Sequence, residues 1–480
     1  MPIRSGLEYI EKIDNLHSSI WIDGQKVNGK ISEHQAFKGV MKSQAALYDL
    51  QLKESNRDIM TFRSPVTGNL VGTSFLEPKT KEDLEKRRLM TQVWAKSSGG
   101  FLGRSPDYMN TVMMSFASAA AIFSEQDERF TKNMLTIFEN AREQDLSFTH
   151  TFINPQVNRS SYYVENFTQT ISAQTTEIKD DGIVINGARL LATQGGITDE
   201  ILVFPANAAG HNKDLAYGFS IPSNTPGLRF ICREPFSYRD SAFDHPLGSR
   251  FDEVDSIVVF DQVLVPWDRV LFYENPLIAQ KIYQESSFHL LAAHQVTCRR
   301  IIKLEMVLGI AQKLIDSIQV GEYQHIHEKI SEIYVGLESL KALLLASEVN
   351  AKADKWGTMV PDANPLQASI LLFARLYPRC TEILQLIGAS GLMAIPTEAD
   401  FSSEIGADLD LYMQGAIVGA EEKVKIFRLA WDISMSAFGT RQSLYERFFF
   451  GDAVRLASGL YMSYPKENYV KLIDQFLDEY

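Results

Sequence analysis

The chain has 480 residues, of which 45% are hydrophobic and 22% are charged, both close to the averages for globular proteins. Its 47 Lys and Arg residues face 60 Asp and Glu residues, and the net charge of -13 argues against nucleic acid or an anionic membrane as the main partner. The three cysteines, Cys232, Cys298 and Cys380, lie far apart and form no CxxC pair. The sequence therefore supports neither a disulfide framework nor a cysteine metal cluster, and we assign no metal.

The first residues, "MPIRSGLEYIEKIDN", carry charges where a signal peptide needs an apolar core. No apolar run approaches the roughly 18 residues that a membrane-spanning helix needs, so we expect a cytoplasmic protein without a membrane partner. Residues 24–31, "GQKVNGKI", have Walker A spacing but end in Ile31, where a magnesium-binding Ser or Thr is required. A hairpin turn is expected there instead.

Residues 80–145 carry apolar side chains at helical spacing and predict a helical N-terminal domain. Within this part, "GRSPDYMN" predicts a helix start, because Ser105 is a good N-cap residue and Pro106 suits the first helical position. Asp107 then complements the helix dipole. Arg104 lies beside the positive end of this helix, and we expect it to help the helix end attract an anion.

Residues 150–275 change to short β-rich runs separated by Gly, Pro, Asn and Asp, and they predict a β domain between helical parts. Two polar segments adjoin or interrupt it. Residues 146–158, "LSFTHTFINPQVN", form either a buried hydrogen-bonding surface or an ordinary polar connection. Residues 191–200, "LATQGGITDE", form either a tight turn or a place where Gly195 and Gly196 let the backbone approach a ligand.

After about residue 280 long helical periods return and predict a C-terminal helix bundle. Several of these helices are apolar on most sides, which indicates burial against neighbours or a second subunit. The expected fold is α+β and mostly α. Its expected parts are an N-terminal α-helical domain (1–149), a central β domain (150–278), and a C-terminal helical bundle and tail (279–480).

Five long segments, in chain order, carry a resemblance to a known family. They are "GRSPDYMN", "SFTHTFINPQVNR", "LLATQGGITDEILVFP", "DSIVVFDQVLVPWDRV" and "GTRQSLYERFFFGD". The sequence resembles the 4-hydroxyphenylacetate 3-hydroxylase oxygenase components, which are two-component phenol hydroxylases that depend on reduced flavin. The similarity runs nearly end to end. It implies an acyl-CoA dehydrogenase-like fold, with an N-terminal α domain, a barrel-like central β domain, and a C-terminal four-helix bundle that builds a homotetramer.

The resemblance also implies the site residues. The catalytic residues would be Arg104, Tyr108 and His150. The substrate-binding residues would be Arg104, Ser105, Pro106, Asp107, Tyr108, His150, Asn207 and Ala208, the last two in a loop over the substrate (207–218) where family members differ. The cofactor-binding residues would be His150, Thr151, Phe152, Pro155, Gln156, Val157, Asn158, Arg159, Thr193, Gly439, Thr440, Arg441 and Gln442.

The activity that the resemblance implies is ortho-hydroxylation of a para-substituted phenol with reduced FAD and O2, the FADH2 coming from a separate NAD(P)H:flavin reductase. Conversion of 4-hydroxyphenylacetate to 3,4-dihydroxyphenylacetate is the first choice. A phenolate is much richer in electrons at the ortho carbon than a phenol, whose pKa is about 10. Arg104, the helix N-terminus, Tyr108 and His150 would favour the anion, and His150, with an unperturbed pKa of about 6.5, is a candidate general base.

Alternatives stay open at this point. The substrate could instead be tyrosine, phenol or a chlorophenol. A hydroxyacyl-CoA dehydratase-like enzyme of the same superfamily would need several cysteine ligands for an iron-sulfur cluster, and the helix that begins at Ser105 has no cysteine. A third alternative is a helical scaffold without chemistry, against which the intact Arg104, Tyr108 and His150 argue.

Overall fold

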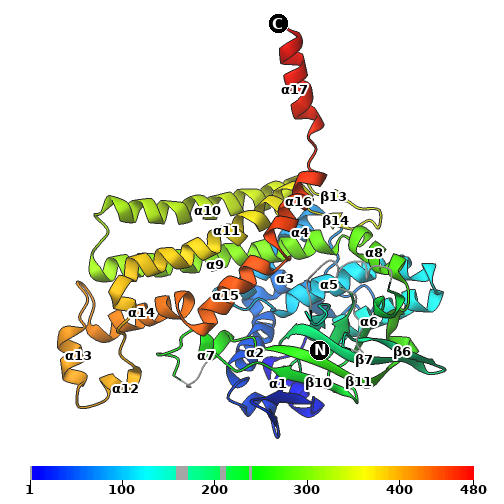
Figure 1. The fold of residues 1–480 in the computed structure, drawn as a ribbon, viewed down its shortest axis with the longest axis horizontal. Coiled ribbons are helices and arrows are strands. Elements are labelled where there is room, and N and C mark those ends of the chain that lie inside the picture. The colour runs from blue at the N-terminus through cyan, green and yellow to red at the C-terminus, as the bar shows by residue number, and fades with distance from the viewer. Residues whose placement is uncertain (1–2, 158–170, 206–211, 237–240, 480) are drawn as a thin grey trace.

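The computed structural model describes residues 3–157, 171–205, 212–236 and 241–479. Long helices run along one side of the molecule, the sheets lie on the other, and the C-terminal helix projects away from both (Figure 1). Within the described ranges, no helix combines the length and the apolar character that crossing a membrane requires.

The N-terminal part is mostly helical, as expected. Its helices are α1 (Gly6–Leu16), α2 (Lys38–Leu52), α3 (Arg57–Met60), α4 (Lys81–Ser97), α5 (Pro106–Ser118) and α6 (Glu128–Gln144). The predicted start of α5 is confirmed, with Ser105 at the N-cap and Pro106 in the first turn. The Ser105 hydroxyl does not cap the helix, however, because it donates to Asp107 Oδ1 at 2.6 Å.

This part also contributes strands, which helical spacing did not predict. They are β1 (Ile20–Ile22), β2 (Gln25–Lys26), β3 (Thr61–Arg63), β4 (Leu70–Gly72) and β5 (Phe148–Thr151). The hairpin expected at residues 24–31 is confirmed, since β1 and β2 pair on either side of Gly24, whose φ is 73°. β1 also pairs in parallel with a strand about two hundred residues later, which three residues cannot signal by their own pattern.

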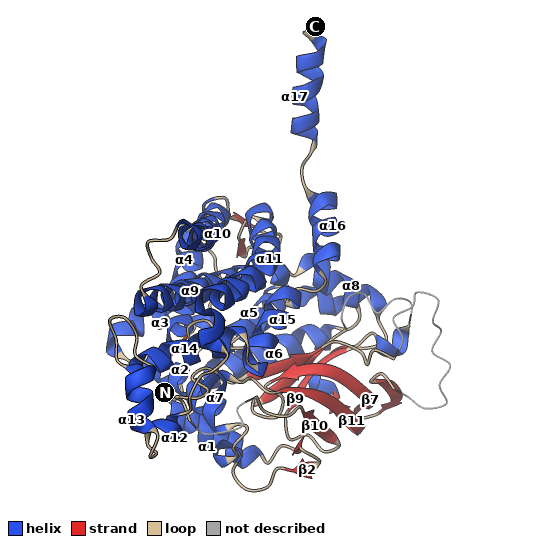
Figure 2. Cartoon of the chain, turned by 60° about the vertical axis from the view of Figure 1, so that its left-hand side comes forward, coloured by secondary structure: helices blue, strands red, loops and turns tan. Residues whose placement is uncertain are grey.

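The central strands form two open sheets. They are β6 (Gln174–Lys179), β7 (Gly182–Thr193), β8 (Glu200–Val203), β9 (Gly218–Pro222), β10 (Leu228–Cys232), β11 (Asp255–Pro266) and β12 (Val270–Phe272). One sheet has the order β2-β1-β10-β11-β7-β6 and the other β12-β9-β8-β5. The barrel-like expectation is therefore wrong for the described strands, because alternating apolar residues predict a buried sheet face but not whether the sheet edges meet. Figure 2 shows the strands packed beside α6.

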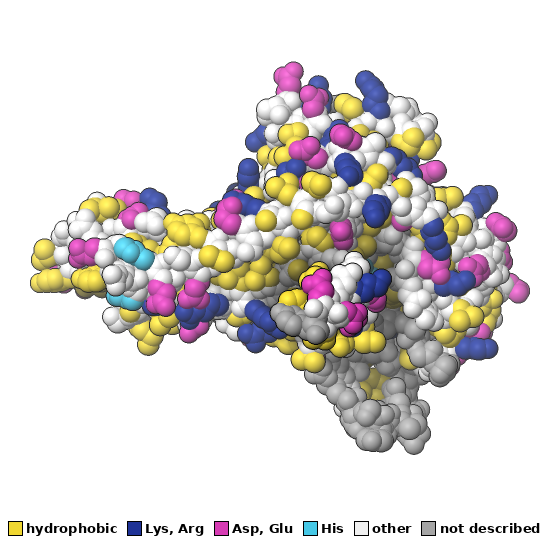
Figure 3. Space-filling view, turned by 90° about the horizontal axis from the view of Figure 1, so that it is seen from above, with side chains coloured by type: hydrophobic (Ala, Val, Ile, Leu, Met, Phe, Trp, Pro, Cys, Tyr) yellow, Lys and Arg dark blue, Asp and Glu magenta, His cyan; other side chains and the backbone are white. Residues whose placement is uncertain are grey.

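The C-terminal part is a bundle followed by an arm. Its elements are α8 (Pro276–Glu285), α9 (Phe288–Ile318), α10 (Gln324–Val349), β13 (Lys352–Ala353), β14 (Met359–Val360), α11 (Ala363–Gly388), α12 (Glu398–Phe401), α13 (Gly406–Tyr412), α14 (Ala420–Ser434), α15 (Ala437–Phe448), α16 (Ala453–Ser463) and α17 (Glu467–Asp478); the short α7 (Gly248–Phe251) precedes β11. α9 packs against α10, α11, α4 and α5, which explains why it is buried on most sides. Seen from above, hydrophobic side chains are exposed along the helical part (Figure 3).

A buried ionic cluster joins α9 to α15. The Glu446 carboxylate binds Arg299 at 2.7 Å, Arg300 at 2.9 Å and Lys303 at 2.8 Å, and all four side chains are 1% exposed or less. Burial lowers the pKa of Lys303 to about 7, although Glu446 opposes this shift. One carboxylate thus balances three basic groups, of which Lys303 bears its charge least easily.

We expect Glu446→Gln to destabilise the fold by about 3–5 kcal/mol, because it leaves buried cations without a counter-charge. Lys303→Met removes one cation, keeps most of the side-chain volume, and should cost far less. Denaturant unfolding of both variants measures the difference. Equal losses in the two variants would show that the loss of the counter-charge is not what makes Glu446→Gln costly.

Candidate active site

Arg104 lies in the turn that leads into α5, and its side chain is stacked among aromatic rings. The guanidinium carbon is 4.1 Å from the centre of the Tyr108 ring and 4.5 Å from that of Phe449. Its Nε and Nη1 nitrogens are buried, and neither has a hydrogen-bond partner in the part of the chain that the structure describes. Buried donors without partners are rare, since each loses its bonds to water. Arg104 thus holds two donors available to a ligand.

His150 is placed beside Arg104 by the parallel pairing of β5 with β8, in which it lies opposite Leu202. The centre of its ring is 5.8 Å from that of Tyr108 and 4.8 Å from that of Phe152. Among the described residues neither ring nitrogen has a partner. Burial, and then the charge of Arg104, lower the pKa of His150 to about 3. The ring is therefore neutral near pH 7, and the unperturbed value used in the sequence analysis is wrong for this environment.

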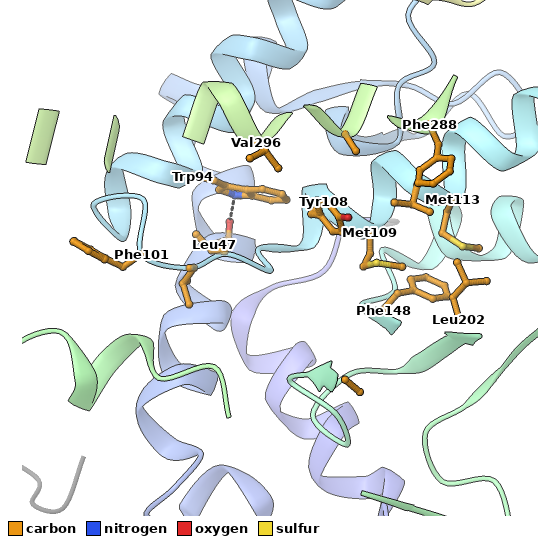
Figure 4. Packing of buried hydrophobic residues seen from close by; sticks show 14 of the residues in the cluster. Leu47, Trp94, Phe101, Tyr108, Met109, Met113, Phe148, Leu202, Phe288 and Val296 are labelled. Atoms are coloured by element: carbon orange, nitrogen blue, oxygen red, sulfur yellow. Dashed lines mark hydrogen bonds between the residues drawn. The ribbon is translucent and has the colours of Figure 1, made fainter. Parts of the chain in front are cut away.

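Tyr108 lies one turn after Arg104 on α5 and belongs to the main hydrophobic cluster. Figure 4 shows it within the group of buried side chains that includes Trp94, Met109 and Phe148. Burial raises the pKa of Tyr108, and the neighbouring Arg104 opposes this shift only in part. The hydroxyl therefore stays protonated near neutral pH and can donate a hydrogen bond.

The other predicted substrate residues of this turn are buried and bonded within the protein. Asp107 accepts hydrogen bonds from Ser105, from Thr91 at 3.0 Å and from Gln295 at 2.9 Å. This carboxylate therefore ties α5 to α4 and α9. Asn207 and Ala208 lie outside the described residues, as do Asn158 and Arg159.

Two of the predicted cofactor residues meet at one carboxylate. The Thr193 hydroxyl donates to Asp255 at 2.9 Å, and the Arg441 guanidinium donates to the same carboxylate at 2.6 and 2.7 Å. Burial alone would raise the pKa of Asp255, but Arg441 and the hydrogen bonds lower it to about 2. Arg441 Nη1 is buried and has no hydrogen-bond partner among the described residues, so one donor is left over.

The remaining cofactor predictions divide into two groups. Three residues are used inside the protein: Thr151 donates to the Leu190 carbonyl, Gln442 bonds Lys303 and the Phe101 carbonyl, and Gly439 packs against the backbone of Ile433. The others, Phe152, Pro155, Gln156, Val157 and Thr440, are at least partly exposed. Residues of the same sequence segment therefore differ in whether a ligand could reach them.

Gly195 and Gly196 form a tight turn. A Cβ atom at Gly195 would lie 2.2 Å from Ser256 Oγ, and one at Gly196 would lie 2.5 Å from the side chain of Ile20. Both glycines therefore let protein side chains approach the backbone. Of the two alternatives drawn from the sequence, the turn is correct, and the ligand approach is wrong because the space is already filled.

Sequence reasoning missed three residues of this site. Tyr445 and Phe449 follow Arg441 on and beyond α15, and the Tyr445 hydroxyl is a further buried group without a partner in the described ranges. Arg441, Tyr445 and Phe449 are each four positions apart, and this spacing could have predicted that they share one face of a helix. Glu253, which accepts backbone N–H groups from Gly103 and Arg104, gave none, because it lies 149 positions from Arg104 in the chain.

The other basic groups near the site are paired with carboxylates. Arg441 binds Asp255 at 2.6 Å and lies 3.8 Å from Glu253. On the other face of α15, Glu446 binds Arg299, Arg300 and Lys303. Arg104 keeps two donors without partners in the described ranges, and in a region with little water its charge would stabilise a bound anion.

Cysteines and metal ligands are not gathered here. Cys232, Cys298 and Cys380 are buried and free. Within the described ranges, no group of three or more His, Cys, Asp or Glu side chains is arranged to hold a metal ion.

Comparisons with known proteins identify the relatives of this chain. The family model described as 4-hydroxyphenylacetate 3-hydroxylase N terminal matches residues 5–272, and the corresponding C-terminal model matches residues 279–478. A Bacillus subtilis (strain 168) protein named "Probable 4-hydroxyphenylacetate 3-monooxygenase" is 54% identical over 477 residues, which cover 99% of each chain.

Solved structures extend the comparison. The oxygenase component of a 4-hydroxyphenylacetate 3-monooxygenase, complexed with FAD and 4-hydroxyphenylacetate, is 42% identical, with a TM-score of 0.94 over 99% of this chain and 98% of that one. A 4-hydroxybutyryl-CoA dehydratase from N. maritimus, 20% identical with a TM-score of 0.89 over 98% and 95% of the chains, shares the fold. The predicted order of helical, β and helical-bundle parts is confirmed. Since the family models and a relative of 54% identity span nearly the whole sequence, this chain belongs to the 4-hydroxyphenylacetate 3-hydroxylase family.

Proposed function

We propose that this protein is the oxygenase component of a two-component flavin monooxygenase that hydroxylates a para-substituted phenol at the ortho carbon. 4-Hydroxyphenylacetate, with 3,4-dihydroxyphenylacetate as product, is the proposed substrate, as the names of the relatives suggest. Overall, the phenol, O2 and FADH2 would give the catechol, water and FAD. The observation that carries the proposal is the set of unpartnered buried nitrogens on Arg104 and His150 beside the Tyr108 ring.

Arg104 would bind the substrate oxygen as a phenolate. A free phenol has a pKa of about 10, so the site must favour the anion for the ring to be activated near neutral pH. The positive charge of Arg104 and its two donors without partners in the described ranges act in that direction. Tyr108 would donate a further hydrogen bond to the same oxygen.

His150 would accept the phenolic proton, or it would accept a hydrogen bond from the phenol hydroxyl of the substrate. Its ring is neutral in the free protein, so one nitrogen can accept while the other donates. A bound phenolate beside it would raise its affinity for a proton, because an adjacent negative charge favours the imidazolium.

The surrounding rings would bind the aromatic substrate and exclude water. Phe152 meets the edge of the His150 ring, Phe204 lies 6.0 Å from it, and Phe449 meets the edge of Tyr108 at 5.3 Å. Aromatic walls of this kind pack well against a phenol and strengthen the electrostatic contacts inside them.

Reduced FAD fits the residues beside this pocket. Arg441 Nη1 and the Tyr445 hydroxyl are buried without partners in the described ranges, and Thr193 and Arg441 share one carboxylate. Arg441, Thr193, Phe152 and the partly exposed residues 155–157 would hold the cofactor. When bound there, the reduced flavin would supply, together with O2, the chemistry that provides the transferred oxygen atom. A separate NAD(P)H:flavin reductase would deliver the reduced FAD.

A homotetramer is part of the proposal. α17 is a 12-residue helix whose residues are all exposed, and it projects from the body (Figure 1). It carries Tyr469, Val470, Leu472, Ile473, Phe476 and Leu477, each more than half exposed. An isolated helix of this length is marginally stable in water, so a second copy of the chain would cover it.

A cytoplasmic location is also part of the proposal. The three buried cysteines form no disulfide, which suits the reducing cytoplasm.

Tyrosine, phenol and chlorophenols remain candidate substrates, and a panel of these phenols with reduced FAD and O2 would rank them by product mass. The dehydratase alternative lacks support, because the three cysteines lie on three separate elements, β10, α9 and α11, and no three His, Cys, Asp or Glu side chains of the described residues are grouped to hold a metal. An iron assay on purified protein tests it.

Arg104→Ala should lower kcat/KM for 4-hydroxyphenylacetate by one to two decades, since it removes a charge-assisted bond worth about 1.5–3 kcal/mol. Binding of reduced FAD should change little, and hydrogen peroxide release should rise because the activated oxygen finds no phenolate. Arg104→Lys should recover only part of the loss. Normal melting together with wild-type hydroxylation and no extra peroxide would refute the phenolate role.

His150→Gln should lower kcat/KM without moving its acid limb between about pH 6 and pH 8. The reason is that kcat/KM reports ionisations of the free protein, in which the pKa of His150 is about 3. The measurement is a pH series for both proteins with a fixed supply of reduced FAD. Loss of a limb near pH 6.5 in the variant would show that His150 titrates there after all.

Deleting residues 465–480 should reduce the assembly from four copies of a 54.1 kDa chain to a smaller species. Light scattering coupled to size exclusion measures the mass. Substituting Leu472 and Ile473 by Ser tests the apolar contact in the full-length chain. A tetramer that survives both changes would place the interface elsewhere.

A further inference from the structure

Three side chains hold the backbone of Arg104 in place. The Glu253 carboxylate accepts the N–H groups of Gly103 at 2.9 Å and Arg104 at 2.6 Å. The side-chain amides of Gln44 and Gln194 each donate to the Arg104 carbonyl at 3.2 Å. Gln194 also donates to Glu253 at 2.9 Å and accepts from Gln44 at 3.0 Å. Both polar groups of the Arg104 backbone are bonded to this network, in which Gln44 Oε1 is buried without a partner among the described residues.

The three residues come from separate parts of the fold. Gln44 lies on α2, Gln194 follows the end of β7, and Glu253 lies between α7 and β11. They are 2%, 4% and 0% exposed, respectively. The nearest cation to the Glu253 carboxylate that forms an ion pair with it, Arg441, is 3.8 Å away, farther than its amide donors. Glu253 is therefore bonded chiefly to the chain around Arg104.

The residue before Arg104 is held by packing. A Cβ atom at Gly103 would lie 2.5 Å from the hydroxyl oxygen of Tyr445, so the glycine backbone lies directly against that ring. Arg104 is thus fixed through its N–H, its carbonyl and the preceding residue. Its Nε and Nη1 atoms, in contrast, are left without partners in the described ranges.

We propose that Glu253, together with Gln194, is a positioning residue for phenolate binding. It holds the Gly103–Arg104 turn so that the guanidinium already points where the substrate oxygen binds. This inference rests on the phenol hydroxylation proposed above. Donors that are preorganised in this way need no rearrangement when charge develops, and a displaced turn would lose that advantage.

A competing role for Glu253 is that of a plain counter-charge to Arg104. The two roles differ in sign. If Glu253 acts only by its charge, Glu253→Gln makes the pocket more positive and favours a bound phenolate. If Glu253 positions Arg104, the same variant loosens the turn and disfavours the phenolate. Gln194→Asn separates the two further, because it weakens the hydrogen bonds to the Arg104 carbonyl and to Glu253 without changing any charge. Asn also tolerates the backbone φ of 63° at this position.

The test uses 4-nitrophenol, whose phenolate is coloured and whose neutral form is not. Full-length protein is saturated with reduced FAD without oxygen, and the absorbance of bound 4-nitrophenol is followed against pH. Wild type should ionise the probe at a lower pH than water does. Glu253→Gln and Gln194→Asn should each reduce the ionisation constant of the bound probe by about three- to tenfold, which corresponds to a rise of about 0.5 to 1 in the pKa of the probe. KM for 4-hydroxyphenylacetate and peroxide release should rise in parallel.

Asp354→Asn is the matched control. Asp354 accepts two backbone N–H groups, from Trp356 and Thr358, and one side-chain hydroxyl, from Ser287, in the β13–β14 region. Its loss should cost comparable hydrogen bonding and leave the ionisation of the probe unchanged. Thermal melting of every variant accompanies the titration, and Gln194→Asn decides alone if Glu253→Gln does not fold.

A wild-type shift that both variants retain would overturn the positioning role and leave the proposed function intact. A lower ionisation pH in Glu253→Gln would also overturn it and identify Glu253 as a counter-charge. A wild-type protein that does not shift the probe at all would contradict the phenolate site itself, and the role of Glu253 with it.

Discussion

Arg104 is bonded to the protein through its backbone, whereas two nitrogens of its guanidinium, Nε and Nη1, have no partner in the described ranges. A buried donor without a partner costs about 1–3 kcal/mol. Glu253, Gln194 and Gln44 hold the backbone at Arg104, and the rings of Tyr108 and Phe449 pack against its guanidinium. An anionic ligand would recover the cost of the two donors on binding. In the proposed site, this arrangement would supply electrostatic preorganisation for a phenolate.

Helix α15 separates two charged regions of the molecule. Arg441 and Tyr445 are four residues apart and face the region of Arg104 and Asp255. Gln442 and Glu446, also four apart and one position on, face the buried Lys303, Arg299 and Arg300. One short helix therefore supplies donors to the candidate site and a counter-charge to the interior. The Phe449 ring beyond it lies between Arg104 and the α9 arginines, at 4.5 Å from the former and about 6 Å from the latter.

Local sequence patterns were sufficient to predict those elements whose structure is set by interactions between residues close in the chain. The start of α5 at Ser105–Pro106 and the turn at Gly24 follow from the backbone preferences of those residues, and the order of helical, β and helical parts follows from periodicity. The pairing of β1 with β10 could not be predicted this way, because three residues carry no register for a strand so distant in the chain. The open edges of the two sheets were equally invisible, since face alternation says nothing of closure.

In the candidate site, too, the residues set by local spacing could be predicted from the sequence, and those set by distant contacts could not. Arg104 and Tyr108 come together because they are four apart at the start of one helix, and the resemblance adds His150 from a strand. What the sequence could not supply is the environment that sets their chemistry. The pKa of His150 falls to about 3 because neighbouring rings and Arg104 surround it, and these contacts exist only in the folded chain. Glu253 is hidden for the same reason, since a carboxylate that accepts backbone N–H groups leaves no mark on the residues to which it binds. The residues proposed to touch the ligand are thus the easier ones to find from sequence, whereas those proposed to hold them in place require the structure.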